Sequence, residues 1–261
     1  MAKNPEKELS IYDHLGELRR VIIISLLATV AMAGVCYTFS DRIMAILLEP
    51  VTEMGYKIVF VGVTEALFTK IKLSLALGFI VAMPVTLQQV WSFIAPALRK
   101  EEKKYAALFI FVSFILFIGG VVFAFFGVYR MGVKFLLQFA GPELVPMLTI
   151  GNYISFTISF LVPFGLVFEL PLASFFLSKM GILTHALLAK NRKYAFLGIL
   201  VIAAAITPTP DLLTMSFMAG PMYLMYELSV WITRLVERGK ARKAREEALA
   251  EEEEIGAYQS S

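Results

Sequence analysis

A histidine and a carboxylate stand at helical spacing in HLGELRR, residues 14–20, immediately before a long apolar run. Glu17 is three residues from both His14 and Arg20, so it can pair with either side chain on a helical face. A membrane anchor needs only the basic flank at this place, and the histidine and glutamate therefore suggest a further purpose. Because an ionised carboxylate accepts two parallel hydrogen bonds from a guanidinium, Glu17 is a candidate ligand for an arginine.

Two more carboxylates stand in FIAPALRKEEKKY, residues 93–105, which follows another apolar run. The preference of cytoplasmic segments for Lys and Arg explains the basic residues here but not Glu101 and Glu102. The acidic pair can form local ion pairs with the next two lysines, worth ~0–1 kcal/mol at a surface. Alternatively, it faces the same side as Glu17, and carboxylates from two segments together bind two adjacent arginines while disfavouring lysines.

Glu169 is a third candidate, because it stands inside an apolar run, LVPFGLVFELPLASFF, residues 161–176. It lies nine residues before Ser178, about 14 Å from the cytoplasmic end of its helix at ~1.5 Å per residue, near the bilayer midplane. An ionisable group at that depth should face protein or a water-filled cavity and is a functional candidate. The alternative is a protonated glutamate that only packs helices together.

Prolines interrupt three of the apolar runs, and each removes a backbone donor and can bend a helix. Membrane helices also tolerate prolines without a special role. Taken together, these prolines predict bent helices that enclose a concavity, in a curved, cup-like arrangement. The four positions are Pro84, Pro163, Pro171 and Pro221.

The composition indicates a membrane protein, since 58% of the 261 residues are hydrophobic and only 17% are charged, with a mean hydropathy of +0.74. Crossing a bilayer takes about 20 predominantly apolar residues. A sixth, shorter run at 194–207 would span only about 21 Å at ~1.5 Å per residue, and would thin the bilayer or lean on polar edges. The five longer runs are 21–39, 71–93, 106–127, 153–178 and 212–232.

Basic residues predict the orientation of these runs. If the amino terminus is cytoplasmic, Lys and Arg residues in the cytoplasmic segments clearly outnumber those outside, and both termini are cytoplasmic. That outcome requires an even number of spans, which supports counting 194–207. The sequence thus predicts an all-α polytopic membrane protein with six transmembrane helices in residues 1–233. A charged cytoplasmic tail, 234–261, is expected to be helical at first and then disordered.

Two outer segments, 41–54 and 128–139, have apolar residues three and four apart, which predicts amphipathic helices lying at the outer interface.

The sequence gives no support for an enzyme or a metal-binding protein, because no H-E-x-x-H, G-x-S-x-G or nucleotide-binding glycine motif occurs. The single cysteine, Cys36, cannot form an intramolecular disulfide or a multi-cysteine metal site. The net charge of +3 is small, and no basic stripe indicates nucleic acid. We therefore expect no enzyme activity, cofactor or metal.

Four motifs together resemble the TatC family of twin-arginine protein translocases. They are HLGELRR before the first run, FIAPALRKEE after the second, FGLVFELPL in the fourth and TPTPD between the last two. The resemblance covers residues 14–234. It implies a six-helix, cup-shaped receptor in the bacterial cytoplasmic (inner) membrane, which binds the consecutive arginines of signal peptides on folded cargo proteins. It also implies TatA-type and TatB-type single-span partners, self-association, and transport driven by the proton-motive force.

Site residues follow from the same resemblance. Glu17 and Glu102 would contact the arginines, with Glu101 as an additional carboxylate, and Glu169 would be the polar group of the concave face. The turn reads TPTPD, with Thr209 added to the family's shorter form. Residues implied to shape the signal-peptide surface are His14, Leu15, Arg19, Phe93 and Pro96. Residues implied to dock the partner subunits, on the fifth and sixth spans, are Pro210, Asp211 and Met215.

Two other functions compete with the receptor. A secondary transporter would use Glu169 as a proton-coupled carboxylate and needs a second polar group at similar depth. A scaffold without a ligand would leave the carboxylates of the two surface segments without a role, and exchanging them for glutamine would leave cargo export unchanged. The other polar candidates all lie nearer the cytoplasmic ends of their runs: Gln88, Gln89 and Glu227.

Overall fold

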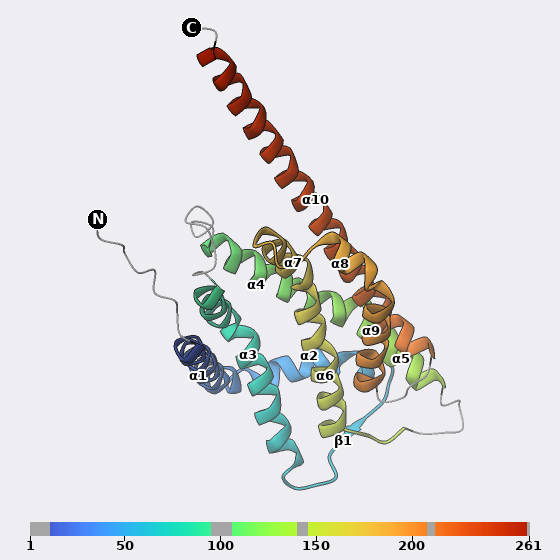
Figure 1. Cartoon of the computed structure of the whole chain (residues 1–261). Coiled ribbons are helices and arrows are strands. Elements are labelled where there is room, and N and C mark those ends of the chain that lie inside the picture. Colours follow the sequence, from blue (N-terminus) through green and yellow to red (C-terminus); the bar gives the residue numbers. More distant parts are fainter. Residues whose placement is uncertain (1–10, 95–105, 140–145, 208–211, 260–261) are drawn as a thin grey trace. The chain divides into compact units, whose positions relative to one another are not determined.

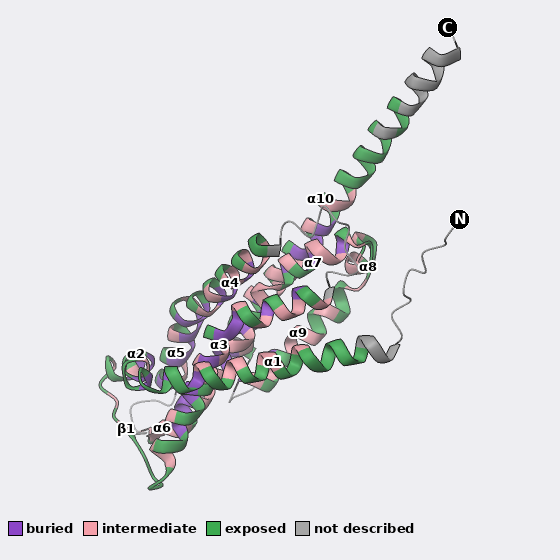
Figure 2. Cartoon of the chain, turned by 90° about the vertical axis from the view of Figure 1, so that its left-hand side faces the viewer, coloured by how far each residue is buried: buried purple, intermediate pink, exposed green. Residues whose placement is uncertain are grey.

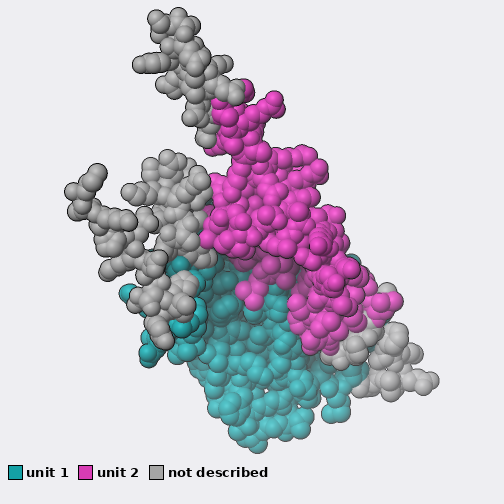
Figure 3. All heavy atoms as spheres, viewed as in Figure 1, with its two compact units in different colours: residues 1–165 teal, residues 166–261 magenta. Residues whose placement is uncertain are grey.

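The computed structural model describes residues 11–94, 106–139, 146–207 and 212–259. Its helices dominate the described chain (Figure 1). The chain divides into two compact units, Met1–Gly165 and Leu166–Ser261, shown in teal and magenta in Figure 3. Each unit is described by itself below.

Unit 1 is built from helices and one pair of very short strands. The strands β1 and β2 pair in parallel, Ile58 with Leu148 and Val59 with Thr149. In chain order the elements are α1 (Ile11–Tyr37), α2 (Ser40–Thr52), β1 (Ile58–Val59), α3 (Glu65–Ile94), α4 (Ala106–Phe123), the π-helix η3 (Ala124–Tyr129), α5 (Arg130–Phe139), β2 (Leu148–Thr149) and α6 (Ile150–Phe168), whose last turn passes into unit 2.

The regular elements in the described part of unit 2 are all helices. Its helix α10 packs against α7, α8 and α9. The elements are α7 (Leu170–Lys179), α8 (His185–Lys190), α9 (Arg192–Ile206) and α10 (Leu212–Gln259).

Within the described ranges, four helical stretches are long and apolar enough to cross a membrane, and they correspond to the first four predicted spans. An all-α polytopic membrane fold is therefore confirmed. The predicted span 194–207 falls on α9, which has 15 residues, and the predicted span 212–232 forms the first part of α10. Neither is among the four, and the count of six stays a prediction. The four stretches are Leu15–Tyr37, Glu65–Phe93, Ala107–Gln138 and Ile150–Lys179.

Small residues let α1 and α3 approach closely. A Cβ added to Gly78 of α3 would lie 2.5 Å from the backbone nitrogen of Ala33 and 2.7 Å from the carbonyl oxygen of Thr29, both in α1. The contact continues a pattern of small residues four apart, which permits close backbone packing between membrane helices. The series is Ser25, Thr29 and Ala33 in α1, with Ser74, Gly78 and Ala82 in α3.

A second close approach joins α4 to α6. The ring of Phe117 is fully buried, and a Cβ on Gly165 would lie 2.6 Å from it. Phe117 also meets Phe79 edge to face, with ring centroids 6.1 Å apart, and belongs to a cluster with Met83 and Leu87. These contacts make α3, α4 and α6 the packed core of unit 1.

Two helices differ from the expected boundaries. The predicted run 106–127 and the helix expected at 128–139 form one continuous stretch, because η3 carries α4 directly into α5. At the other end of the chain, α10 continues to Gln259, through the segment for which partial disorder was expected. Residues with high helix propensity fill that segment, and the i,i+4 pair Arg242–Glu246, at 3.3 Å, supports it.

Near Glu169, where the prolines predicted a bent helix, the structure has a helix break. Glu169 separates α6 from α7, and its backbone N–H bonds three residues back, to the carbonyl of Leu166 at 3.1 Å. Pro171 lacks the N–H that would bond Val167, so the regular helix cannot run through this point. The other three prolines, Pro84, Pro163 and Pro221, lie inside α3, α6 and α10.

Candidate functional site

The HLGELRR segment lies in the first turns of α1, which begins at Ile11 and is helical well before the apolar run. The side chains of Leu15, Glu17 and Arg19 are exposed, Leu15 by 56%. His14 is part of the same helix, and its side chain lies outside the description. The structure thus places a carboxylate, an aliphatic side chain and a guanidinium on the surface of one helix end.

The second predicted segment begins at the end of α3. Phe93 is half-buried there, and two residues earlier Trp91 is buried against Phe109 of α4, with ring centroids 4.7 Å apart. This contact joins the end of α3 to the beginning of α4, the two helices that flank the carboxylate-bearing segment. Pro96, Glu101 and Glu102 lie outside the described residues, so the meeting of Glu17 with Glu102 stays a prediction.

Figure 2 shows that α1 and α3 run in opposite directions, so that the first turns of α1 and the end of α3 lie at the same end of unit 1. Glu17 lies 12 residues from Thr29 at the helix crossing, about 18 Å at ~1.5 Å per residue. Phe93 lies 15 residues from Gly78, about 22 Å. Glu17 and Phe93 therefore lie at comparable heights above the crossing, and we refer to this part of the described chain as the α1-start end.

The opposite end of unit 1, here named the strand end, comprises α2, β1, β2, α5 and the first turns of α3 and α6. Its central group is Glu65, which sequence reasoning missed. Its Oε2 accepts hydrogen bonds from the N–H groups of Val61 at 2.8 Å and Gly62 at 3.3 Å, and its Oε1 accepts from Gly151 N–H at 2.8 Å. One carboxylate thus binds the loop before α3 to the start of α6. No sequence signal identified this pairing, because Gly151 is 86 residues away.

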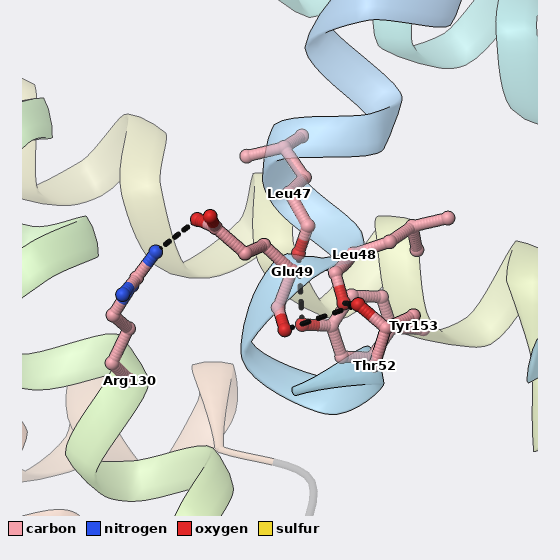
Figure 4. A network of polar contacts seen from close by, with 6 residues as sticks. All are labelled: Leu47, Leu48, Glu49, Thr52, Arg130 and Tyr153. Atoms are coloured by element: carbon pink, nitrogen blue, oxygen red, sulfur yellow. Dashed lines mark hydrogen bonds and ion pairs between the residues drawn. The ribbon is translucent and has the colours of Figure 1, made fainter. Parts of the chain in front are cut away.

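A second set of polar contacts attaches α2 to this end, as Figure 4 shows. Arg130, at the start of α5, forms an ion pair with Glu49, and its guanidinium also lies over the ring of Phe126, 5.2 Å from the centroid. The hydroxyl of Tyr153 donates to the carbonyl of Leu47 at 3.0 Å. α2 is amphipathic as expected, and its buried side packs on α3 and α5.

Tyr129 forms the interior of the strand end. It is 1% exposed, and its hydroxyl lies 2.5 Å from that of Thr157 in α6. Its ring contacts Tyr153 edge to face and is stacked on Phe125. Two further contacts belong to the strand end, the ion pair of Lys70 with Asp41 at 2.6 Å and the hydrogen bond of Lys72 to Ser155 at 2.7 Å. The polar side chains named at this end therefore serve mainly to bind helices to one another.

In unit 2, Glu169 stands at the break before α7, is half-buried, and has one carboxylate oxygen, Oε1, hidden from solvent. The placement agrees with the expectation that this side chain faces protein rather than lying fully exposed. Of the predicted docking residues, Met215 is half-buried in the first turns of α10. Pro210 and Asp211 lie outside the described residues.

Glu227, a polar group considered for the transporter alternative, is engaged in unit 2. Arg192 at the start of α9 forms an ion pair with it at 2.8 Å, and the hydroxyl of Tyr223 donates to it at 2.9 Å. Tyr226 donates to the carbonyl of Leu188 at 2.7 Å. Glu227 thus joins α10 to α9, which does not favour a role as a mobile proton carrier.

The next turns of α10 bind the ends of two other helices. Glu237 accepts a hydrogen bond from the N–H of His185, at the start of α8, at 2.9 Å. Lys240 donates to the carbonyls of Ser178 at 2.9 Å and Lys179 at 2.7 Å, at the end of α7. Both arrangements complement the helix dipoles, an anion at an amino end and a cation at a carboxyl end. Across the described residues, no three potential metal-ligating side chains come together.

Comparison with known proteins gives a consistent result. Residues 13–221 match the family model described as "Sec-independent protein translocase protein (TatC)". The chain is similar to the protein of that name from Carboxydothermus hydrogenoformans, with 47% identity over 232 residues, covering 89% of this chain and 96% of the relative. It is 39% identical over 236 residues to the one from Aquifex aeolicus, covering 89% and 98%.

A solved structure agrees with these sequences. The crystal structure of a twin-arginine translocase receptor, TatC, superposes with a TM-score of 0.79 at 38% identity and covers 86% of this chain and 99% of that one. A second crystal structure of such a receptor gives a TM-score of 0.78 at 39% identity, covering 84% and 99%.

Proposed function

Because the chain belongs to the TatC family of Sec-independent protein translocase proteins, we propose that it is the receptor subunit of a twin-arginine translocase. In this role it binds the consecutive arginines of signal peptides on folded cargo. The observation that carries the proposal is the exposed carboxylate of Glu17, on a helix end shared with Leu15 and Arg19. It lies at the end of unit 1 where α3 leads into the segment that carries Glu102.

The proposed chemistry is recognition without covalent change. Glu17 and Glu102 each accept hydrogen bonds from one guanidinium of the signal peptide, with Glu101 as a further acceptor. A guanidinium offers a planar fork of donors, whereas an ammonium is a point charge, so the pair of carboxylates distinguishes Arg-Arg from Lys-Lys. His14, Leu15, Arg19, Phe93 and Pro96 form the surrounding surface.

The proposed setting is the bacterial cytoplasmic (inner) membrane. Six spans within residues 1–233 form a cup-like arrangement with both termini cytoplasmic, as the distribution of Lys and Arg supports. TatA-type and TatB-type single-span subunits dock on the fifth and sixth spans near Pro210, Asp211 and Met215, and copies of the chain associate with one another. Transport of the folded cargo uses the proton-motive force.

Glu169 has a separate proposed role, as a polar group that acts after initial binding. Its half-buried position at the α6–α7 break supports this role. We expect Glu169→Ala to impair transport in vesicles more than it weakens binding of signal peptide to the detergent-purified chain. An equal loss in the two assays would place Glu169 in the recognition surface instead.

The deciding experiment measures binding of a labelled twin-arginine signal peptide to the detergent-purified chain, beside the same peptide with both arginines changed to lysine. We expect a clear preference for the arginine peptide, reduced about tenfold by Glu17→Gln, which is the loss of roughly 1.4 kcal/mol of charge-assisted hydrogen bonding. The matched control is Glu53→Gln, another exposed carboxylate, which lies just after α2. Equal binding of both peptides to the folded chain would refute the receptor proposal.

A further inference from the structure

One face of α10 changes character along its length. Leu224 and Trp231 are each 59% exposed, and the arginines of the following turns, Arg234 and Arg238, are also exposed. At ~100° per residue, these side chains and two later arginines, Arg242 and Arg245, fall within about 80° of one another around the helix. We name Trp231 and the four arginines the arginine face.

The arginine face differs from the face that α10 packs against its neighbours. Val230 and Thr233 are buried, and Glu237 and Lys240 bind the ends of α8 and α7. Those positions lie on another part of the helix circumference at ~100° per residue. Figure 2 shows the later turns of α10 as exposed. The arginine face thus stays exposed when α10 packs against the other helices of unit 2.

Arginine and lysine occupy different faces of this helix. The usual excess of basic residues in cytoplasmic segments does not require this, because Lys or Arg at any position on the helix fulfils it. Here, in 233–245, every arginine falls on the arginine face, whereas Lys240 and Lys243 fall on other faces. Arginine binds phosphate through two parallel hydrogen bonds, and lysine binds it as a point charge.

An exposed tryptophan points to the same kind of ligand. Tryptophan is enriched where apolar and polar phases of a membrane meet, because its ring is apolar and its N–H is polar. Trp231 stands at the end of the proposed sixth span, with an aliphatic side chain on one side of it along the helix and arginines on the other. The order from Leu224 to Arg238 follows the order of acyl chain, interface and phosphate in a leaflet.

Distance along the helix separates the arginines into two pairs. Arg234 and Arg238 follow Trp231 by about 5 and 10 Å at ~1.5 Å per residue. Arg242 and Arg245 follow it by about 17 and 21 Å, and Arg242 is paired with Glu246 at 3.3 Å. A leaflet's polar region is only about 5–8 Å deep. Long side chains from the first pair reach that layer, and those of the second pair do not when the helix is upright.

We propose that Trp231, Arg234 and Arg238 form a binding site for the headgroup of an anionic phospholipid in the leaflet that surrounds α10. The tryptophan ring lies at the boundary of the acyl chains, and the two guanidiniums bind the phosphate and a second anionic or hydroxyl oxygen of the headgroup. This site lies within unit 2 and depends on the proposed sixth span, not on signal-peptide recognition.

The test is native mass spectrometry of the full chain, released from neutral detergent with added phosphatidylglycerol or phosphatidylcholine. We expect retention of phosphatidylglycerol over phosphatidylcholine. The double variant Arg234→Gln/Arg238→Gln should reduce that retention more than tenfold, from about fivefold per arginine near an anionic surface. The matched control, Arg242→Gln/Arg245→Gln, removes the same charge from the same face and should retain the lipid nearly as the unchanged chain does.

Several outcomes would overturn the proposal. Equal loss in the two double variants would indicate attraction by net charge rather than a site, and equal retention of both lipids would exclude headgroup recognition. Binding of free glycerol phosphate as strong as that of phosphatidylglycerol, with no dependence on acyl chains, would assign the site to a soluble phosphate. A change of oligomeric state in Arg234→Gln/Arg238→Gln alone would assign the face to a second copy. As a control, circular dichroism of each variant should show an unchanged helix content.

A second measurement locates the tryptophan independently. Trp91 and Trp231 are the only two tryptophans of the chain, so Trp91→Phe leaves Trp231 as the single emitter. In bilayers with lipids brominated near the headgroup, we expect strong quenching of its fluorescence. Lack of quenching would show that Trp231 does not face the interface, and the proposed site would be wrong.

Discussion

The two ends of unit 1 use their carboxylates in opposite ways. At the strand end, Glu65 accepts hydrogen bonds from three backbone N–H groups and Glu49 pairs with Arg130, so both carboxylates hold helices together. At the α1-start end, Glu17 is exposed on the first turns of a helix beside exposed Leu15 and Arg19. The difference shows that a carboxylate beside a membrane helix does not by itself indicate a binding site. What distinguishes Glu17 as a candidate is its surroundings, because exposed aliphatic and guanidinium side chains stand beside it on the same helix end.

The largest expected effect on stability comes from a substitution at the crossing of α1 and α3, which lies between the two ends of unit 1. In Gly78→Ala the new Cβ would meet the backbone of Ala33 at 2.5 Å, so α1 and α3 would have to move apart. We expect a loss of about 3 kcal/mol in the free energy of unfolding, as for overpacked cores, measured by thermal unfolding in detergent. The control is Gly119→Ala, where a Cβ meets nothing within 4 Å. Equal stability of the two variants would contradict the tight crossing.

The second effect tests the structural role of the strand end. Glu65→Ala leaves the N–H groups of Val61, Gly62 and Gly151 without their acceptor, and we expect a clear loss in the free energy of unfolding, smaller than that of Gly78→Ala. Hydrogen exchange should rise at these three amides. Glu53→Ala, which removes an exposed carboxylate nearby, should change stability by less than about 0.5 kcal/mol. Similar losses in both would mean that the contacts of Glu65 contribute little.

The third effect is the opposite of the second, because it concerns a substitution that should weaken peptide binding and leave stability unchanged. Glu17→Ala should leave the free energy of unfolding within about 0.5 kcal/mol of the unchanged chain, because the side chain is exposed. It should nevertheless weaken twin-arginine peptide binding about tenfold, while Glu65→Ala, measured where it is still folded, should bind nearly normally. If the two variants exchanged these phenotypes, the contrast between the two ends would be wrong.

The smallest expected effect on stability comes from removing a single hydroxyl at the strand end. Tyr153→Phe removes the donor to the Leu47 carbonyl at 3.0 Å and keeps the buried ring. We expect a loss of about 1 kcal/mol in the free energy of unfolding. Tyr194→Phe, at a position 62% exposed, is the matched control and should have no measurable effect. A neutral Tyr153→Phe would mean that this hydroxyl contributes nothing to holding α2 in place.

Sequence reasoning predicted the elements whose signal is local. Apolar runs long enough to span a membrane predicted the four long helical stretches, although their ends were placed too far inward. α3 begins at Glu65 rather than at residue 71, because Lys70 and Lys72 continue the helix through ion pair and hydrogen-bond contacts to Asp41 and Ser155. The break at Glu169 was also predictable, since Pro171 has a local effect on the backbone.

Features that depend on distant pairing could not be predicted in this way. The acceptor role of Glu65 exists only because β1 meets β2 and brings Gly151 next to the loop before α3. The partnership of Arg130 with Glu49 likewise joins residues 81 apart. Of the candidate site, the exposure of Leu15, Glu17 and Arg19 agrees with the prediction of a binding surface, while the role of each residue stays a prediction.

The π-helix η3 has a consequence for how this stretch of chain tolerates changes in length. A π-turn closes one residue later than an α-turn, so Ala124–Tyr129 acts as an insertion within an otherwise regular helix. Deleting one residue there would let α4 and α5 join as uninterrupted α-helix, and the residues on either side would keep nearly the same faces, because the wide turn already accommodates the extra residue. Deleting a residue from the regular helix of α4 would instead rotate everything that follows by about 100°, so that Tyr129 would turn away from Thr157, and Arg130 from Glu49. Chains that share the strand-end contacts should therefore gain or lose a single residue within Ala124–Tyr129 rather than elsewhere between Phe117 and Arg130.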